Sequence, residues 1–458
     1  MIQQYLAQNR QRSLDQLKTL VRFPSVSTQP EHRRDVLACA DWLARLFRTL
    51  GLDVKLHPTN GNPIVVARTR WHRAGAPRVL IYGHYDVQPP EPLESWNTPP
   101  FEPVVRDGQL FGRGASDNKG QFFAHVNAVE AYVKTGTPVP ANVTFLIEGE
   151  EEIGSAHLGL FVKRHAKSLR ADYIVVSDTA MFSKRHPTIA YATRGIAGLE
   201  VRVDGPSRDL HSGVFGGSVA NPALVLAQML AKCVDAHGHV TVPGFYAEVK
   251  PLAAWERRKW QRLPFDARAY RDFLGVPALA GETGFTPLEQ RWARPTFEIN
   301  GLTSGYQGPG GKTIVPAWAS AKISCRLVPN QDPARAVQLV SRHLRRICPR
   351  SVRLSIVSDH SAPFFEPPTG CGARAAAAAL ERAFGTKPVF VREGGSLPIL
   401  DTFKRHLGGE IILVGLGLPD DNWHSPNEKM DLDNFQRGAV MSAALLQELA
   451  KTHPPRLR

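Results

Sequence analysis

A histidine and a carboxylate lie two residues apart in the segment 83–89 (GHYDVQP), directly after the apolar run 79–81. Such a run is typical of a buried strand. Because residues i and i+2 of an extended segment point the same way, His84 could bind a metal ion while Asp86 steadies it. The carboxyl end of a strand is also where open α/β sheets bind ligands. Taken alone, the pair is more typical of a hydrogen-bonded turn than of a metal site.

Four further segments place acidic or histidine side chains at the ends of apparent strands. They are Asp117 in the glycine-rich turn 112–120, the acidic run 148–152 after the strand 143–147, Asp178 after the strand 174–177, and His424 beyond the strand 411–414. Each has a common alternative explanation: a helix N-cap, a solvated acidic run, a turn cap and a surface histidine. Together they predict five strand ends that converge on one rim of one sheet.

Donors of this kind suit two zinc ions. Zn²⁺ binds histidine nitrogen and carboxylate oxygen at low coordination number, which leaves room for a water molecule. A bridging carboxylate, with one histidine and one further carboxylate for each ion, is a common arrangement in two-metal sites. Mn²⁺ or Co²⁺ could substitute, because nitrogen and oxygen ligands discriminate poorly among these ions.

Hydrophobic periodicity predicts the elements that must position these donors. For the first part of the chain we expect helices over 13–21, 36–50 and 122–133 and strands over 54–56, 64–67, 79–82, 142–147 and 173–176. The second part is expected to have strands over 198–203, 319–327 and 352–357 and helices that begin near 222 and 333, with an unassigned excursion over 240–300. The last part is expected to have helices over 371–384 and 435–446 and strands over 388–391 and 410–414. This order predicts an α/β domain interrupted by an inserted α+β domain.

The bulk composition narrows the class of protein. The chain has 458 residues, 43% hydrophobic and 21% charged, which is ordinary for a soluble globular protein. Without a long apolar window or a signal-peptide layout, we expect no membrane span and no export. Five scattered cysteines argue against a disulfide framework and favour a reducing, cytoplasmic setting. The net charge of +14 comes without a long basic run, so we expect no nucleic-acid partner.

The chain resembles the dizinc metallopeptidase family that includes carnosine dipeptidases, glutamate carboxypeptidases, aminoacylases and succinyl-diaminopimelate desuccinylase. It is most similar to the carnosine and cytosolic nonspecific dipeptidase branch, over nearly its whole length. The segments that carry the resemblance are 83–89, 113–120, 210–213, 326–330 and 424–428. It implies a zinc-peptidase-like catalytic domain, residues 1–195 and 363–458, whose mixed sheet is flanked by helices. It also implies an inserted ferredoxin-like domain, residues 196–362, that serves as a lid and in dimerisation.

The resemblance also implies a set of metal ligands. His84 and Asp178 would hold one zinc ion. Glu152 and His424 would hold the other, and Asp117 would bridge the two ions.

Two further residues would act beside the metals. Asp86 would orient His84 without touching a metal ion. Glu151 would be the general base, which takes a proton from the water between the ions and passes it to the leaving amine. The run of three glutamates, 150–152, leaves the register open by one residue, and the following Gly154-Ser155 selects Glu151.

The remaining candidates concern the substrate. Arg326, at the end of a strand of the inserted domain, could bind a substrate carboxylate in bidentate fashion. Gly394, Gly395 and Ser396 offer free backbone N–H groups for an anion, which the resemblance identifies with the same carboxylate. His360 is a weaker candidate for substrate contact.

His211 also lies in the inserted domain, where a plain loop histidine is the alternative. The resemblance implies that it reaches into the active site of the partner subunit of a homodimer and binds the developing oxyanion.

The predicted function is zinc-dependent hydrolysis of the amide bond of dipeptides or short peptides. The alternative enzyme is an N-acyl-amino-acid amidohydrolase; in this family an aspartate at position 178 tends to go with peptidases and a glutamate with acylases and the desuccinylase. The non-enzyme alternative is an inactive family member that acts as a binding or scaffold protein. Every expected ligand and the expected base are present, which argues against that alternative.

Overall fold

The computed structural model describes residues 1–452, which divide into two compact units. Unit 1 is formed by Met1–Tyr191, Glu366–Val391 and the chain from Ile399 onward, and unit 2 by Ala192–Phe365 and Arg392–Pro398. The sequence-based boundaries, 195/196 and 362/363, placed everything after 363 in the first domain. The structure differs at the segment Arg392–Pro398, because the Glu393 N–H donates to the Ala192 carbonyl at 2.7 Å within unit 2.

Unit 1 is built around an eight-stranded mixed sheet with the order β1-β2-β6-β3-β7-β18-β8-β17. Its strands are β1 (Asp53–His57), β2 (Ile64–Arg68), β3 (Arg78–His84), β6 (Asn142–Glu148), β7 (Tyr173–Val176), β8 (Thr188–Ala190), β17 (Val389–Val391) and β18 (Glu410–Val414). Strand β3 pairs in parallel with β6 and β7, and β7 pairs in parallel with β18. The carboxyl ends of these four strands therefore lie at one edge of the sheet.

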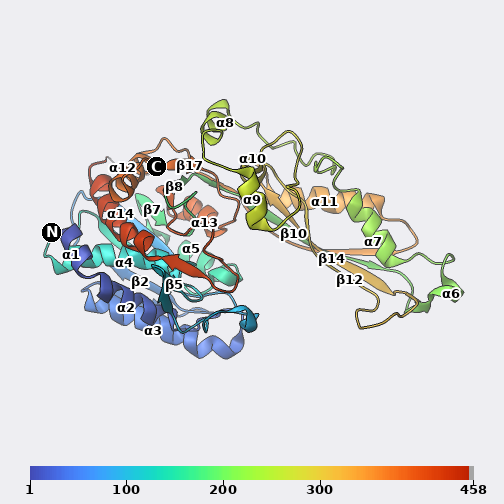
Figure 1. The fold of residues 1–458 in the computed structure, drawn as a ribbon, viewed down its shortest axis with the longest axis horizontal. Coiled ribbons are helices and arrows are strands. Elements are labelled where there is room, and N and C mark those ends of the chain that lie inside the picture. The colour runs from blue at the N-terminus through green and yellow to red at the C-terminus, as the bar shows by residue number, and fades with distance from the viewer. Residues whose placement is uncertain (453–458) are drawn as a thin grey trace. The chain divides into compact units, whose positions relative to one another are not determined.

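Helices cover both faces of this sheet (Figure 1). They are α1 (Ile2–Gln8), α2 (Arg10–Val21), α3 (Arg33–Thr49), α4 (Lys119–Lys134), α5 (Leu158–Leu169), α12 (Cys371–Phe384), α13 (Ile399–His406) and α14 (Leu432–Ala450). Successive strand residues point to opposite faces. Ile81 of β3 packs into the core that α3, α4 and α14 share, whereas the Tyr82 ring meets Phe403 of α13 with ring centroids 5.3 Å apart.

A small three-stranded sheet, with the order β19-β5-β4, brings the C-terminal part of the chain to the turn that precedes α4. Its strands are β4 (Val104–Arg106), β5 (Gln109–Phe111) and β19 (Lys429–Asp431). Lys429 pairs with Phe111 in antiparallel register, so residues just before Lys429 lie beside residues just after Phe111. This pairing was not predicted, because each strand is only three residues long.

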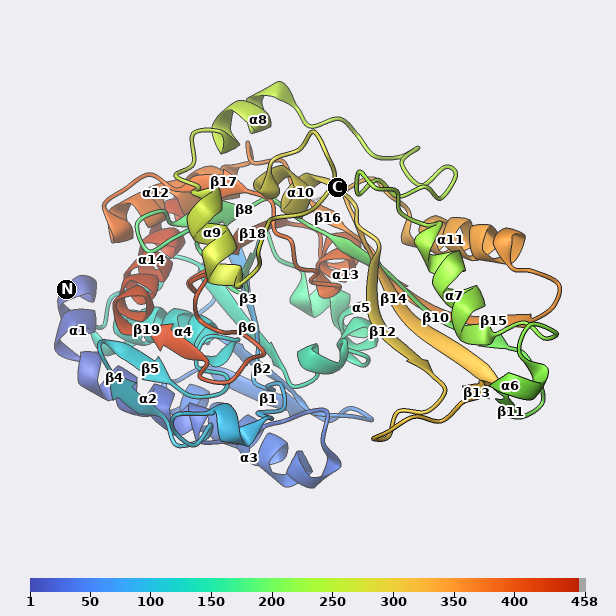
Figure 2. The ribbon, with the colours of Figure 1, turned by 45° about the vertical axis from the view of Figure 1, so that its right-hand side comes forward.

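Unit 2 has an antiparallel four-stranded sheet with the order β12-β14-β10-β15. Its main elements, in chain order, are β10 (Gly195–Asp204), α7 (Pro222–Ala231), β12 (Glu298–Ser304), β14 (Trp318–Leu327), α11 (Pro333–Ile347) and β15 (Arg353–Ser361). This is the β-α-β-β-α-β order of the ferredoxin-like motif. Both helices lie beside this sheet (Figure 2). They contribute to one core through Leu226 and Leu230 of α7 and Val340 and Leu344 of α11.

The smaller elements of unit 2 are β9 (Ala192–Thr193), β11 (Leu210–His211), α6 (Ser212–Phe215), α8 (Ala254–Trp260), α9 (Ala267–Leu274), α10 (Pro287–Ala293), β13 (Ile314–Val315) and β16 (Phe364–Phe365). Three of them, α8 to α10, lie in the excursion 240–300. Their caps are local: the Asp266 carboxylate accepts the N–H groups of Arg268 and Ala269 at the start of α9.

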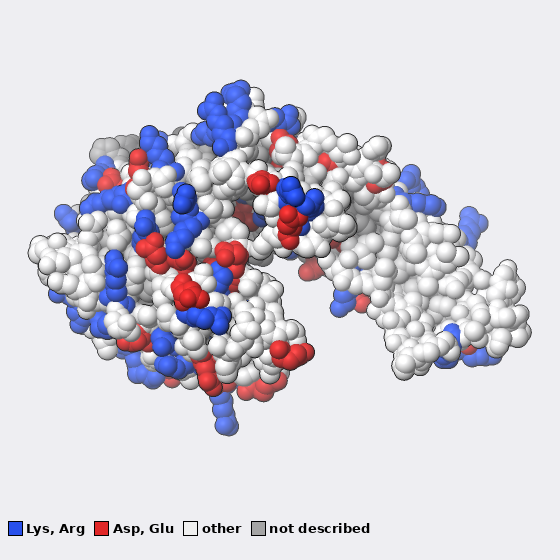
Figure 3. All heavy atoms as spheres, in the orientation of Figure 1, with Lys and Arg blue, Asp and Glu red and all other residues white. Residues whose placement is uncertain are grey.

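Charged side chains of both signs are interspersed over unit 1 on the face drawn in Figure 3, without a continuous basic stripe. The positive net charge is therefore dispersed on this face, as a solvated surface requires. Within residues 1–452, none of the helices has the length and apolar character needed to cross a membrane.

A buried histidine joins three elements of unit 1. His125 of α4 is fully buried, and its Nδ1 and Nε2 each lie 2.8 Å from a hydroxyl, those of Ser442 and Ser177. The Ser177 hydroxyl donates to the Val414 carbonyl at 2.6 Å, so it can only accept from His125. Nε2 therefore carries the proton, and Nδ1 accepts from Ser442. Burial lowers the pKa of His125 to about 4.

This histidine should make the fold sensitive to acid. Its folded pKa lies below the unfolded value, so the unfolded chain binds more protons and stability falls as pH falls from about 6.5 toward about 4. Between pH 7 and pH 5 the loss from His125 amounts to about 2 kcal/mol. Urea unfolding should be measured at pH 7 and pH 5 with the same metal chelator present. The free energy of unfolding should fall less between these pH values for His125→Gln than for the wild type. Equal losses in the two proteins would contradict the assignment.

Candidate metal centre

His84 is the last residue of β3 and is fully buried. Its Nδ1 lies 3.1 Å from the main-chain oxygen of Asp86, which can only accept, so Nδ1 carries the proton. Its Nε2 then presents a lone pair and has no hydrogen-bond partner, although it is buried. This nitrogen lies 3.3 Å from Asp117 Oδ1 and 3.7 Å from Asp178 Oδ1. A buried lone pair that faces two carboxylates fits a metal ion between them.

Asp117 lies in the turn before α4 and faces two histidines with its two oxygens. Oδ1 faces His84, and Oδ2 lies 3.0 Å from Nε2 of His424. Helix α4 begins at Lys119 with Asn118 as its N-cap residue, so Asp117 is not the helix cap. An aspartate that shares its two oxygens between two histidines has the geometry of a bridging ligand.

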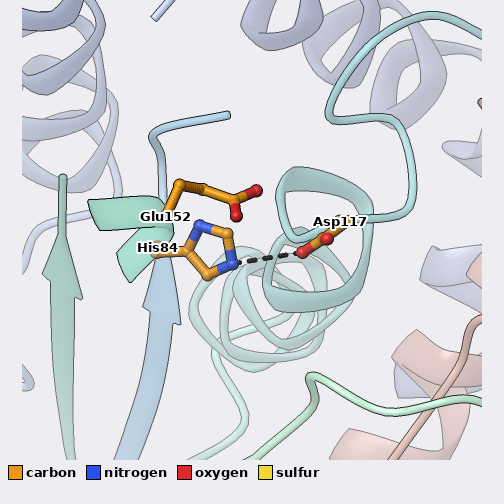
Figure 4. Close-up of side chains that lie close together, drawn as sticks. All are labelled: His84, Asp117 and Glu152. Carbon is orange, nitrogen blue, oxygen red and sulfur yellow. Dashed lines mark ion pairs between the residues drawn. The ribbon is translucent and has the colours of Figure 1, made fainter. Parts of the chain in front are cut away.

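Glu152 completes a group that could hold a metal ion. Ligand atoms of His84, Asp117 and Glu152 all lie within 4.8 Å of one another. Figure 4 shows these three side chains pointing toward a common space. His424 adds a fourth donor, because its Nε2 is 3.5 Å from Glu152 Oε2.

Asp178 joins the cluster from the end of β7. Asn118 donates to its Oδ1 at 2.8 Å and to the Ser177 carbonyl at 2.6 Å. The amide therefore fixes the side chain that faces His84.

Asp86 has a wider role than orienting His84. Its carboxylate is 3.4 Å from Nδ1 of His84, farther than its own main-chain oxygen. The two carboxylate oxygens instead accept the N–H groups of Glu151 at 3.2 Å and Glu152 at 3.1 Å. Asp86 thus holds the short 3₁₀ turn η3 (Glu151–Ile153) against the end of β3.

The electrostatics of the cluster call for a cation. Burial, reinforced by Asp117, raises the pKa of Glu152 to about 10, and burial likewise raises the pKa of Glu151 well above its ordinary value. Burial lowers the pKa of His84, but the facing carboxylates of Asp117 and Asp178 outweigh it, so this pKa is well above its ordinary value. Without a cation, the raised pKa values of Glu152, Glu151 and His84 favour their protonated forms, and a divalent cation would displace these protons.

The predicted single rim of strand ends is correct only in part. His84, Asp178 and the run 148–152 lie at or just after the ends of strands of the eight-stranded sheet, and His424 follows β18 only after the loop 415–423. Asp117 follows β5, which belongs to the three-stranded sheet. The turn reaches the others because α4, which it precedes, packs against the same sheet.

The predicted substrate residues lie in unit 2. Arg326 of β14 donates to the Ser396 hydroxyl at 2.9 Å. The expectation of free N–H groups at Gly394 and Gly395 is wrong, because Glu393 Oε1 accepts both, at 2.6 and 3.3 Å. A glutamate side chain, one methylene longer than that of aspartate, can fold back onto its own turn, which the motif alone did not reveal.

The two histidines of unit 2 that the sequence singled out are both exposed. His211 ends β11, and its Nδ1 accepts the Gly213 N–H at 3.0 Å. His360 lies in β15, opposite Ala197 of β10. Neither is part of the metal cluster, all of whose members belong to unit 1.

Three residues without a predicted role contact the cluster. Gln88 donates to Glu152 Oε2 at 2.8 Å, Asn118 donates to Asp178, and Glu428 accepts the Asp117 N–H at 2.9 Å. All three lie inside the segments that carry the family resemblance. Their position in those segments was the available signal.

Fold and donor set together define the class: an α/β protein with a candidate metal centre at the carboxyl edge of a mixed sheet, and a second unit of β-α-β-β-α-β order. The chain belongs to peptidase family M20/M25/M40, whose family model matches residues 80–448. The predicted family is thus confirmed.

The relatives cover nearly the whole chain. It is 34% identical to the human Beta-Ala-His dipeptidase over 98% of this chain and 92% of that protein. It is 33% identical to the Cys-Gly metallodipeptidase dug1 of Schizosaccharomyces pombe over 96% of this chain and 95% of that protein.

Solved structures confirm the predicted α/β fold. The dipeptidase Dug1p of Saccharomyces cerevisiae matches with a TM-score of 0.88 at 30% identity, over 98% of both chains. Human carnosine dipeptidase 1 matches with a TM-score of 0.87 at 32% identity, also over 98% of both chains.

The cluster should couple metal binding to stability. Zn²⁺ at one hundred times its Kd should stabilise the metal-free protein by about 2.7 kcal/mol, since it binds only the folded donors. Differential scanning fluorimetry should show a higher midpoint with Zn²⁺, and Asp117→Ala should remove the shift. Asp172→Ala is a matched control, because it removes a carboxylate that binds Arg78 at 2.8 Å at the opposite edge of the sheet. Zinc shifts of equal size in wild type and Asp117→Ala would contradict the site.

Proposed function

We propose that this protein is a zinc-dependent peptidase that hydrolyses the amide bond of dipeptides or short peptides. The observation that carries the proposal is Asp117, whose two oxygens face His84 and His424 while the buried Nε2 of His84 has no partner. The dipeptidases among its relatives support the substrate class. Its five cysteines are free thiols, which supports a reducing, cytoplasmic setting.

Two zinc ions per chain are proposed, with Mn²⁺ or Co²⁺ as substitutes. His84 and Asp178 would hold one ion, Glu152 and His424 the other, and Asp117 would bridge them. The donors are two imidazoles and three carboxylates, a set that zinc accepts while keeping a position for water.

When bound, the ions supply Lewis acidity toward the scissile carbonyl and lower the pKa of a water molecule. Glu151 accepts the proton of that water on its carboxylate and delivers it to the nitrogen of the leaving amine. Asp86 supports this role, because its carboxylate accepts the Glu151 N–H and so fixes the start of the base's side chain. The same carboxylate accepts the Glu152 N–H and places base and ligand together.

Unit 2 would recognise the substrate. Arg326 would bind its C-terminal carboxylate in bidentate fashion, with Ser396 and the turn at Gly394 and Gly395 beside it. His360 would contact the substrate more weakly.

A substrate panel tests the function. Zinc-loaded protein should hydrolyse dipeptides, and Glu151→Gln should lower kcat at least about one-hundred-fold, because it removes the proton carrier. The matched readout is bound zinc, which should stay the same in the variant, measured by atomic absorption.

Two outcomes would reject the proposal in different ways. Hydrolysis of N-acyl amino acids alone would favour the amidohydrolase. Bound zinc without turnover of either class would favour the binding or scaffold protein.

A homodimer is also proposed, in which His211 of one subunit stabilises the oxyanion in the other. Mixing two inactive variants tests it. Equal amounts of Glu151→Gln and His211→Ala are unfolded and refolded together, so that about half of the dimers are heterodimers. In each heterodimer one of the two active sites has both Glu151 and His211. About a quarter of the wild-type activity should therefore return. Each variant alone gives the baseline. If the mixture stays at that baseline, His211 acts in its own subunit or not at all.

A further inference from the structure

Glu428 is a buried carboxylate outside the donor set, four residues after His424. Its side chain is 1% exposed, so its oxygens must be satisfied within the protein. Oε1 accepts the N–H groups of Ser116 at 3.0 Å and Asp117 at 2.9 Å, and Oε2 accepts that of Gly114 at 2.9 Å. One carboxylate thus binds three main-chain donors of the turn that carries Asp117.

Strand pairing brings Glu428 to this turn. Lys429 is paired with Phe111 between β19 and β5, and the Gly112 N–H donates to the Glu428 carbonyl at 2.9 Å. Glu428 therefore lies where β5 ends and the turn begins. The segment that carries His424 is joined here, by main chain and side chain, to the segment that carries Asp117.

Arg113 balances the charge of Glu428 and extends the connection. Its Nη1 donates to Glu428 Oε2 at 2.9 Å, and its Nη2 donates to the Pro89 carbonyl at 3.1 Å. Pro89 lies five residues after His84. Both charged side chains are 1% exposed, so each needs the other to offset its desolvation. The pair connects the three segments that carry His84, Asp117 and His424.

We infer that Glu428 is a positioning residue that holds Asp117 in place between His84 and His424 before any metal ion binds. The inference rests on the proposed function, in which Asp117 bridges two ions. The carboxylates of the cluster repel one another, so without a cation the turn would relax away from them. Hydrogen bonds to the peptide groups of 114, 116 and 117 oppose that relaxation. An ion then meets ligands already in place, which strengthens binding.

The test is zinc affinity, measured by isothermal titration calorimetry of metal-free protein. Glu428→Gln should weaken zinc binding about ten- to one-hundred-fold, because its amide has a single accepting oxygen, so one of the two pairs of donors that Glu428 binds loses its acceptor. Glu428→Asp keeps the charge but shortens the side chain by one methylene, and should weaken binding as well.

Glu410→Gln is the matched control. Glu410 is also a buried carboxylate that accepts main-chain N–H groups, those of Gly372 and Ala373, both at 2.8 Å, at the start of α12. Its loss should lower stability without changing zinc affinity. This comparison separates positioning of Asp117 from a general loss of fold.

A second measurement needs no variant. Hydrogen–deuterium exchange of the metal-free wild type should show protection at the amides of 114, 116 and 117, because Glu428 holds them without metal. Rapid exchange there would overturn the inference, as would wild-type zinc affinity in both Glu428 variants. A wild-type protein that binds no zinc would instead reject the proposed function, and the inference with it.

Discussion

Mutual repulsion among buried carboxylates is the constraint on which the rest of unit 1 depends. Asp117, Glu152 and Asp178 gather around two histidines, with Glu151 beside them. Like charges in a poorly hydrated site disfavour one another, and burial together with the charge of Asp117 raises the pKa of Glu152. In the absence of metal, bound protons reduce this repulsion, and metal cations would reduce it further. A cluster of this kind persists only if the interactions of the surrounding chain with the donors are stronger than the repulsion among the donors.

The surrounding chain does so with partners that bind each donor from outside. Asn118 binds Asp178, Gln88 binds Glu152, and Glu428 binds the peptide group of Asp117. The Asp86 carboxylate binds the peptide groups of 151 and 152. Amide side chains and peptide N–H groups hold a ligand without adding a rival cation to the site. This explains why the informative segments of the chain extend several residues beyond the ligands themselves.

Residue type and periodicity predicted the donors and most of the sheet. The apolar runs that become β3, β6 and β7 lie in parallel register, and this alone brings their polar ends together. Contacts between segments far apart in sequence were beyond such reasoning. The pairing of β5 with β19 joins strands of three residues that have no periodicity to detect. The return of Glu393 onto Gly394 depends on a rotamer, which no spacing rule specifies.

Unit 2 shows the same electrostatic design with the opposite sign. Burial, together with the positive charge of Arg326, lowers the pKa of Arg194 to about 10, and burial lowers that of Arg326. In the proposed function, two partly desolvated guanidinium groups would suit an anion, as the carboxylates of unit 1 would suit cations. In the proposed function that anion is the C-terminal carboxylate of a peptide. Each unit would then gather side chains of one sign of charge, which lowers its own stability. Binding of the metal ions and of the substrate would offset that loss of stability.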